Sequence, residues 1–326
     1  MKVAFVTEMN FEGKVPSNYQ NMRTEFSWMH TMDATHFHIR NLLNLNGYDK
    51  VFIIFPKGKV FLSAEGSTIS DSKNPVSDLL EMDLVGILKS KGNKSVFYVQ
   101  EGPHWWFNDY EIVDQIRFYN MISSCDGIYA HNESDLKYYK GMFPDKEVRV
   151  IPTLMVEELI KDIKPIPEDK VIIGGNFCRW YGGFESYIVA SNFGLPIWVQ
   201  TSHAMRKNEE SIGINHLPRV SWVEWMKQLS SFKYAVHLMS TVAAGTFSLN
   251  CAYFGIPCIG NVEVDTQRIC HPELSVHVGD IQRARELVLK LSRDNDFYNE
   301  CSNSSVNNFK SKYSINNFIE KMYDVR

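Results

Sequence analysis

The sequence predicts an α/β protein built from two open, mostly parallel sheets, each covered by helices. Two observations support this prediction. Short runs of β-branched and aromatic residues alternate with segments of helical periodicity along the whole chain, which is the pattern of repeated β-α-β units. The alternation is interrupted near the middle by residues 164–169, KPIPED, a charged segment with two prolines that is typical of a linker.

The chain length supports the same division, because 326 residues are more than one hydrophobic core usually holds. We expect an N-terminal Rossmann-like domain at 1–163 and a C-terminal one at 164–326. The sequence leaves open whether the last helix, near 315–323, crosses back to the first domain.

The elements of the first half follow from local pattern. Residues 21–45 contain helix-compatible stretches, and apolar residues recur with helical spacing after Asn74, a residue suited to cap a helix. We expect strands at 2–7, 50–55, 95–99, 127–130 and 148–152, and helices at 75–91, 111–123 and 133–141.

The second half repeats the pattern, with strands expected at 171–173, 196–200, 234–238 and 257–260. Helices are expected at 185–193, 222–230, 246–254, 280–293 and 315–323. Ligands of such sheets bind beyond the carboxyl ends of the strands, so we expect an active site between the two domains.

Composition narrows the class of protein. A hydrophobic content of 44% and a charged content of 22% are those of a soluble globular protein, and no apolar run approaches the length of a membrane span. The N-terminus resembles a first strand more than a signal peptide, and six scattered cysteines without a CxxC pair indicate a reducing cytoplasm and no zinc site. A net charge of −4 argues against a dedicated nucleic-acid-coating protein but permits a local basic face.

A glycine turn is the first candidate for chemistry. Residues 170–185, KVIIGGNFCRWYGGFE, combine an apolar strand, a Gly-Gly turn and a following helix. Such a turn presents backbone N–H groups to an anion, here from Gly174, Gly175 and Asn176, and Arg179 adds a positive charge. The alternative is an ordinary turn with a surface arginine.

The order of these parts resembles a GT-B glycosyltransferase. Residues 241–260, TVAAGTFSLNCAYFGIPCIG, are similar to the donor-binding helix of that superfamily, in which a Gly-x-Pro turn leads into the next strand. The resemblance implies a nucleotide-sugar donor, UDP in particular, bound near Gly245, Thr246 and Asn250 without a metal ion. Asn250 stands where GT-B helices usually carry a ribose-binding glutamate, so ribose recognition here would lack its charge.

Four short pieces of the chain carry a narrower resemblance: Val15-Pro16-Ser17, GG-x-F-x-R at 174–179 with Glu185-Ser186 after it, Asp265-Thr266-x-Arg268-Ile269, and the strand 96–99 followed by Gln100 and Glu101. In their order and spacing they resemble the T-even bacteriophage β-glucosyltransferases, which modify 5-hydroxymethylcytosine in DNA. The resemblance implies transfer of glucose or a sugar such as arabinose to that base in double-stranded DNA, in the host cytoplasm. It also implies that Arg268 lies near the diphosphate and that Glu101 is the catalytic carboxylate.

Glycosyl transfer needs a base for the acceptor hydroxyl, and we expect Glu101 in this role because it follows a strand directly and precedes Gly102-Pro103. Glu25 is the second candidate, although it could instead be a first-turn acid of a helix. Glu8 and Glu12 are weaker candidates. A well-placed base favours inversion at the anomeric carbon.

The acceptor side is expected near His104, Trp105 and Trp106, because aromatic faces stack extruded bases or sugar rings, although such residues more often pack in a core. Arg23 is a candidate contact to the DNA backbone, with Lys14, Arg40, Lys57 and Lys59. Two other functions stay open: a GT-B enzyme acting on a glycan or small molecule, and a non-catalytic GT-B-derived binding module.

Overall fold

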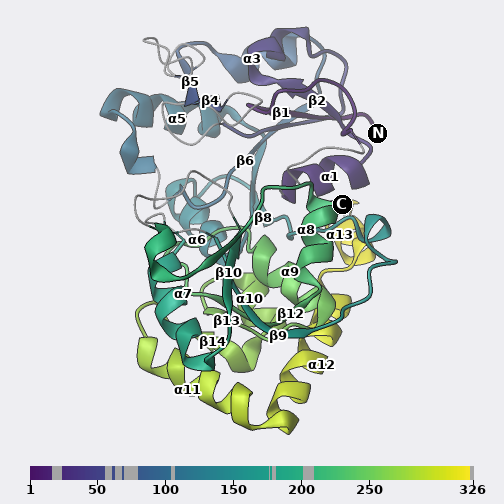
Figure 1. The fold of residues 1–326 in the computed structure, drawn as a ribbon. Coiled ribbons are helices and arrows are strands. Elements are labelled where there is room, and N and C mark those ends of the chain that lie inside the picture. The colour runs from purple at the N-terminus through teal and green to yellow at the C-terminus, as the bar shows by residue number, and fades with distance from the viewer. Residues whose placement is uncertain are drawn as a thin grey trace. The chain divides into compact units, whose positions relative to one another are not determined.

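The computed structural model describes residues 1–16, 24–55, 61–62, 68–69, 80–103, 107–175, 177, 181–200 and 209–323. The chain forms two compact units that divide between Ile151 and Pro152, and Thr24 groups with the second unit (Figure 1). The division therefore precedes the boundary expected at 163/164, because the chain leaves the first sheet at Val150 and Met155 already packs in the core of the second unit. The C-terminal helix α13 (Ile315–Tyr323) groups with the second unit.

The first unit contains a sheet of six parallel strands in the order β2-β1-β3-β6-β7-β8. Apolar residues on both faces explain its burial, since sheets of this kind are covered on both sides. The strands are β1 (Val3–Thr7), β2 (Thr35–His38), β3 (Lys50–Ile53), β6 (Ser95–Val99), β7 (Gly127–Ala130) and β8 (Val148–Val150).

The helices of the first unit are α1 (Thr24–Thr31), α3 (Leu84–Ser90), α5 (Ile112–Ser124) and α6 (Glu133–Met142), with 3-10 turns at Ile39–Asn44 and Phe107–Asp109. Strands β4 (Phe61–Leu62) and β5 (Thr68–Ile69) pair separately. The helix expected at 75–91 is described only toward its end, where Asp83 caps α3 by accepting from Gly86 N at 3.0 Å. Asn74, the expected cap, lies outside the described residues.

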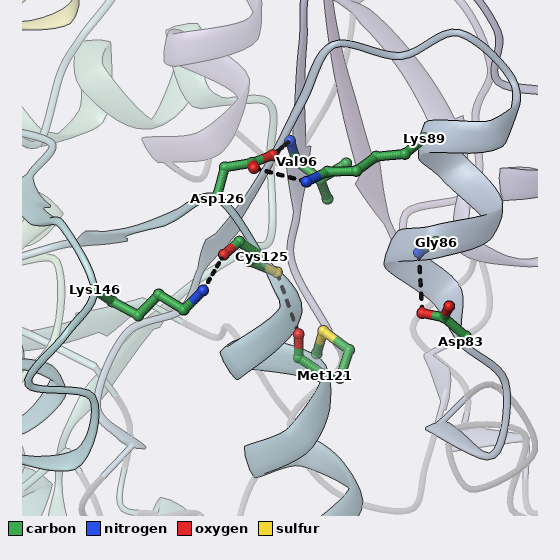
Figure 2. Close-up of polar contacts among 8 residues, drawn as sticks. All are labelled: Asp83, Gly86, Lys89, Val96, Met121, Cys125, Asp126 and Lys146. Atoms are coloured by element: carbon green, nitrogen blue, oxygen red, sulfur yellow. Dashed lines mark hydrogen bonds and ion pairs between the residues drawn. The ribbon is translucent and has the colours of Figure 1, made fainter.

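Polar contacts join helices and strands at the amino-terminal edge of the first sheet (Figure 2). One oxygen of Asp126 accepts from Lys89 Nζ at 2.7 Å and the other accepts from Val96 N at 2.8 Å. Lys146 Nζ donates to Cys125 O at 2.7 Å, and burial raises the pKa of the Cys125 thiol to about 12. This thiol therefore stays protonated, and the edge holds strands together without offering a reactive group.

The second unit contains a second parallel sheet of six strands in the order β11-β10-β9-β12-β13-β14. Strand β9 begins within the expected linker, because Glu168 and Asp169 already belong to it. The strands are β9 (Glu168–Ile173), β10 (Ile197–Gln200), β11 (Asn215–Leu217), β12 (Phe232–His237), β13 (Cys258–Asn261) and β14 (Ser275–Val276).

Helices cover both faces of this second sheet. Two of them, α7 (Gly183–Ala190) and α11 (Ile281–Arg293), bury their apolar residues with Val171, Ile173 and Val236 on one face. The opposite face packs against α8 (Trp222–Leu229), α9 (Thr246–Phe254), α10 (Asp265–Cys270) and α12 (Asn295–Lys312). The 3-10 turns lie at Glu157–Leu159, Ser191–Phe193, Glu209–Ile212 and Pro272–Leu274.

None of the helices in the described part of the chain is both long and apolar enough to cross a membrane.

Candidate active site

The glycine turn of the second unit follows β9 directly. A Cβ on Gly174 would lie 2.4 Å from Cγ of His237, and one on Gly175 would lie 2.7 Å from Cβ of Tyr181. Gly175 also has φ +70°, a conformation that side chains rarely adopt. The N–H of Gly174 donates to Val236 O at 2.9 Å, so this N–H extends the sheet and does not face a ligand. Asn176 and Arg179 lie outside the described residues.

Helix α7 begins in very close contact with the end of β12. Gly182 precedes the helix with φ +60°, and a Cβ there would lie 1.9 Å from Leu238 O. Ser186 Oγ accepts from Leu238 N at 2.9 Å. The glycine turn, the start of α7 and the end of β12 therefore form one tightly packed edge.

Helix α9, the expected donor helix, begins at this edge as well. Its cap Gly245 has φ +73°, and Gly245 O accepts hydrogen bonds from Ser248 Oγ at 3.1 Å and Thr266 Oγ1 at 2.8 Å. The Ser248 hydroxyl is thus engaged within the protein. Thr246 is the first residue of the helix and is half-buried, and the N–H groups of a first helical turn have no partners within their own helix. This turn is suited to accept an anionic group.

Two expected donor contacts lie on α9 and α10. Asn250 is 5% exposed, so only a small part of its amide is open to solvent. Arg268 is 45% exposed and forms an ion pair with Asp265 at 2.8 Å. Because this ion pair is partly solvated, the Arg268 side chain can rotate away from Asp265 and toward a phosphate.

His237 is a residue of this edge that the sequence analysis does not single out. It is the last residue of β12, and burial lowers its pKa to about 4, so the imidazole is neutral at pH 7. Phe247 packs edge-on at 5.0 Å between ring centroids, and Nε2 has no hydrogen-bond partner among the described residues. Its position at the end of a strand expected at 234–238 is the signal that could have identified it.

Glu101, the first candidate base, follows β6 at the carboxyl edge of the first sheet. The register pairs Val99 with Tyr129, so Glu101 and His131 each lie two residues beyond a paired position on neighbouring strands. Glu101 is half-buried and His131 is 3% exposed. This places a carboxyl group and an imidazole at the same level of adjacent strands.

Helix α1 contacts the same edge through Trp28. Trp28 packs on His131 with 4.7 Å between ring centroids. Glu25 lies three residues before Trp28, on the same side of the helix, and is 3% exposed. Sequence reasoning identified Glu25 and Glu101 but not His131, which follows the expected strand 127–130 and could have been found by that position.

The expected acceptor residues His104, Trp105, Trp106 and Arg23 lie outside the described residues. Glu12, a weaker candidate base, is engaged by His38 N at 2.9 Å and Asn41 Nδ2 at 2.8 Å. In the part of the chain that the structure describes, no group of three or more His, Cys, Asp or Glu side chains could hold a metal ion.

No protein-family model and no curated protein sequence matches this chain, but solved structures do. An alpha-glucosyltransferase in complex with UDP and a 13-mer DNA containing an HMU base aligns over 99% of this chain and 98% of its own, with a TM-score of 0.63 and 9% identity. Sucrose-phosphate synthase from Thermosynechococcus elongatus aligns over 99% and 97%, with a TM-score of 0.66 and 11% identity. These structures and this chain share two parallel-sheet, Rossmann-like domains. The fold is GT-B.

A third GT-B neighbour is Anabaena HepE in complex with UDP, which covers 99% of this chain and 98% of its own, with a TM-score of 0.66 and 8% identity. At these identities the similarity establishes the GT-B fold alone. The alignments cover 99% of this chain. The carboxyl edges of both sheets, one with the Gly174-Gly175 turn and the other with Glu101, therefore belong to the GT-B fold.

Proposed function

We propose that this protein transfers a sugar from a UDP-sugar to the hydroxymethyl group of 5-hydroxymethylcytosine in double-stranded DNA. The observation that carries the proposal is the whole-chain match to a UDP- and DNA-bound alpha-glucosyltransferase, which covers 99% of one chain and 98% of the other. The resemblance of short sequence motifs to phage DNA glucosyltransferases supports the same acceptor. The proposed donor sugar is glucose or a related sugar such as arabinose.

In the proposed reaction Glu101 takes the proton of the acceptor hydroxyl as its oxygen attacks the anomeric carbon. The bond between that carbon and the β-phosphate oxygen breaks, and UDP leaves with the electron pair. The first turn of α9, Gly175 and the arginines Arg179 and Arg268 would stabilise the negative charge that develops on the diphosphate. In this proposal these groups stabilise the leaving diphosphate without a metal ion.

Direct displacement of this kind inverts the anomeric centre, which is the stereochemical prediction. NMR analysis of the product anomer tests it independently of the acceptor. A retained anomer would contradict direct displacement and would require Glu101 to act in another way.

A second candidate function is transfer to a glycan or small molecule. The match to sucrose-phosphate synthase favours it, because that structure covers this chain as completely as the DNA-bound one. The net charge of −4 favours it as well. The third candidate, a non-catalytic binding module, is supported by Asn250 in place of the usual glutamate and by Ala243 in the small-residue run before it.

The decisive experiment supplies duplex DNA containing 5-hydroxymethylcytosine, or unmodified DNA, with a panel of UDP-sugars, and measures nucleoside masses. We expect a mass gain on the modified base alone. Glu101→Gln should lower the rate by a factor of roughly 100 or more, since removing a general base typically costs this much. Glu111→Gln, at an exposed glutamate of the same unit, is the matched control and should leave the rate unchanged.

Transfer to an oligosaccharide or small molecule, with none to DNA, would overturn the proposed acceptor and support the second candidate. UDP binding without transfer to any acceptor or hydrolysis of any UDP-sugar would support the binding module.

A further inference from the structure

The turn that carries Glu101 is held by helix α6 at two backbone positions. One is the carbonyl of Gln100 and the other is the N–H of Gly102, so the two hydrogen bonds flank Glu101 on both sides. Both partners, Asp135 and Tyr139, lie four residues apart on α6 and therefore one above the other on the same helical face.

Asp135 holds the side of the turn after Glu101. Its side chain is completely buried, and Oδ2 accepts from Gly102 N at 3.0 Å and from Asn132 Nδ2 at 2.9 Å. Asn132 caps the helix by accepting from Asp135 N at 2.8 Å. Gly102 has φ +59°, a conformation that favours glycine, so the bond to Asp135 fixes a sharp turn directly after the candidate base.

Tyr139 holds the side of the turn before Glu101. Its hydroxyl donates to Gln100 O at 3.2 Å. The ring is 1% exposed and packs edge-on against Tyr98, with 5.9 Å between centroids, so the hydroxyl is presented from a fixed position in the core.

Both hydrogen bonds from α6 are made to backbone atoms on either side of Glu101. Along β6, Val96 and Tyr98 face the core that contains Tyr139, whereas Phe97 stacks with Phe52 on the other face. Tyr139 therefore reaches Gln100 O from the core side of the sheet.

We infer that Asp135 and Tyr139 are positioning residues that fix Glu101 for proton transfer, a role that rests on the proposed function of Glu101 as the base. Placement of a reacting group within a fraction of an ångström strongly affects catalytic rate. Two anchors on one rigid helix provide such placement without contacting the substrate.

Tyr139→Phe tests this role because it removes one hydroxyl and keeps the ring. We expect kcat for transfer to fall about tenfold, which is the size of effect that a small misplacement of a catalytic group produces. The KM for UDP-sugar should not change, because the donor edge lies in the other unit. Tyr138→Phe, at a half-buried tyrosine of the same helix, is the matched control and should leave both constants unchanged.

A double-mutant cycle separates positioning from general stabilisation. If Tyr139 acts through Glu101, Tyr139→Phe should cause no further loss in the Glu101→Gln background, measured by mass spectrometry after long incubation. An equal tenfold loss in both backgrounds would overturn the inference, as would an unchanged kcat in the single variant. Asp135→Ser provides a second test, with the same loss of kcat and the same unchanged KM expected.

The failure of this inference differs from the failure of the proposed function. If Glu101→Gln transfers sugar as fast as the unmodified protein, Glu101 is not the base and the proposed mechanism fails with the inference. If Glu101→Gln is impaired but Tyr139→Phe and Asp135→Ser are not, only the positioning role is wrong.

Discussion

Buried neutral histidines are the residue-scale feature with a direct effect on stability. Burial lowers the pKa values of His36 and His271 to about 4, and His237 has the same shift. The hydrogen bonds of His36 define its neutral form: Nδ1–H donates to Phe11 O at 2.7 Å, and Nε2 accepts from Thr7 Oγ1 at 2.8 Å. Protonation would add a charge that the buried site does not solvate.

The lowered pKa values of these histidines make the free energy of unfolding depend on pH. Between the unfolded pKa near 6.5 and the folded pKa near 4, the unfolded state binds more protons, so lowering the pH favours unfolding. We expect the free energy of unfolding to be highest above about pH 6.5 and to fall by up to about 1.4 kcal/mol per pH unit for each histidine below it.

Urea unfolding of the His36→Asn variant checks this expectation between about pH 7 and about pH 4.5. The variant should be less stable at neutral pH but should lose less stability on acidification than the unmodified protein. His30→Asn, at an exposed histidine, controls for loss of an imidazole. Equal slopes for His36→Asn and the unmodified protein would show that His36 does not contribute.

For individual residues, the sequence identifies candidate site residues but not the residues that contact them. Glu101 was predicted from its place after a strand, and the structure adds that Asp135 and Tyr139 hold its backbone. His131 and His237 were not predicted, because their importance depends on tertiary neighbours such as Trp28 and Phe247. Gly174 was predicted as a backbone donor, but its N–H is used by Val236.

At the scale of elements, the start of α7 depends on a glycine that no other residue can replace without strain. An alanine at Gly182 would place its Cβ 1.9 Å from Leu238 O in addition to adopting φ +60°. We expect Gly182→Ala to lower the free energy of unfolding by roughly 3 kcal/mol or more, because backbone atoms must move apart. UDP binding should weaken as well, since the same backbone shapes the proposed donor edge.

Gly194→Ala in the same unit is the matched control. Gly194 has a similar φ of +66° but a Cβ there would meet nothing within 4 Å. It should cost only about 1 to 2 kcal/mol, the usual penalty for the left-handed conformation. Thermal or urea unfolding and UDP titration of both variants measure the difference, and equal losses would refute the close-contact explanation.

Elements with a strong local pattern were predicted better than those that depend on neighbours. The strand 127–130 and the helices 246–254 and 133–141 match β7, α9 and α6 closely, and the strand 171–173 is the second half of β9. Strands β2, β11 and β14 were not predicted. They are short strands at the edges of their sheets and contain polar residues, as in Asn215–Leu217. Their pairing is set by the neighbouring strand more than by their own composition. Helix α12 was missed because its sequence, rich in Asn and Ser, lacks a clear apolar period.

At the scale of the whole molecule, the predicted order of two parallel-sheet domains is confirmed by the GT-B fold. The alternation of strands and helices was sufficient for this, because right-handed crossovers leave few other arrangements. The acceptor does not follow from the fold, since DNA-bound and sugar-phosphate-synthesising neighbours match over the whole chain alike.

Binding to DNA tests the proposed acceptor at the scale of the whole molecule. Because the net charge is −4, attraction to phosphates must come from a local basic surface. We expect affinity for duplex DNA containing 5-hydroxymethylcytosine to fall with salt, with a slope of log K against log salt of about −0.9 for each phosphate contacted. Fluorescence anisotropy over a range of salt concentrations measures this slope. Affinity that does not depend on salt would argue against the proposed DNA acceptor.

One described arginine allows this surface to be located. Arg40 is exposed and lies just after β2, at the carboxyl edge of the first sheet. Lys14 forms an ion pair with Asp33 at 2.7 Å. Arg40→Gln should weaken duplex binding and reduce the magnitude of the salt slope by about one, because one phosphate contact is lost. Arg285→Gln, at an exposed arginine of α11 in the second unit, should leave the slope unchanged. If the two variants behave alike, the DNA contact does not involve this edge, and the acceptor surface must be sought elsewhere on the molecule.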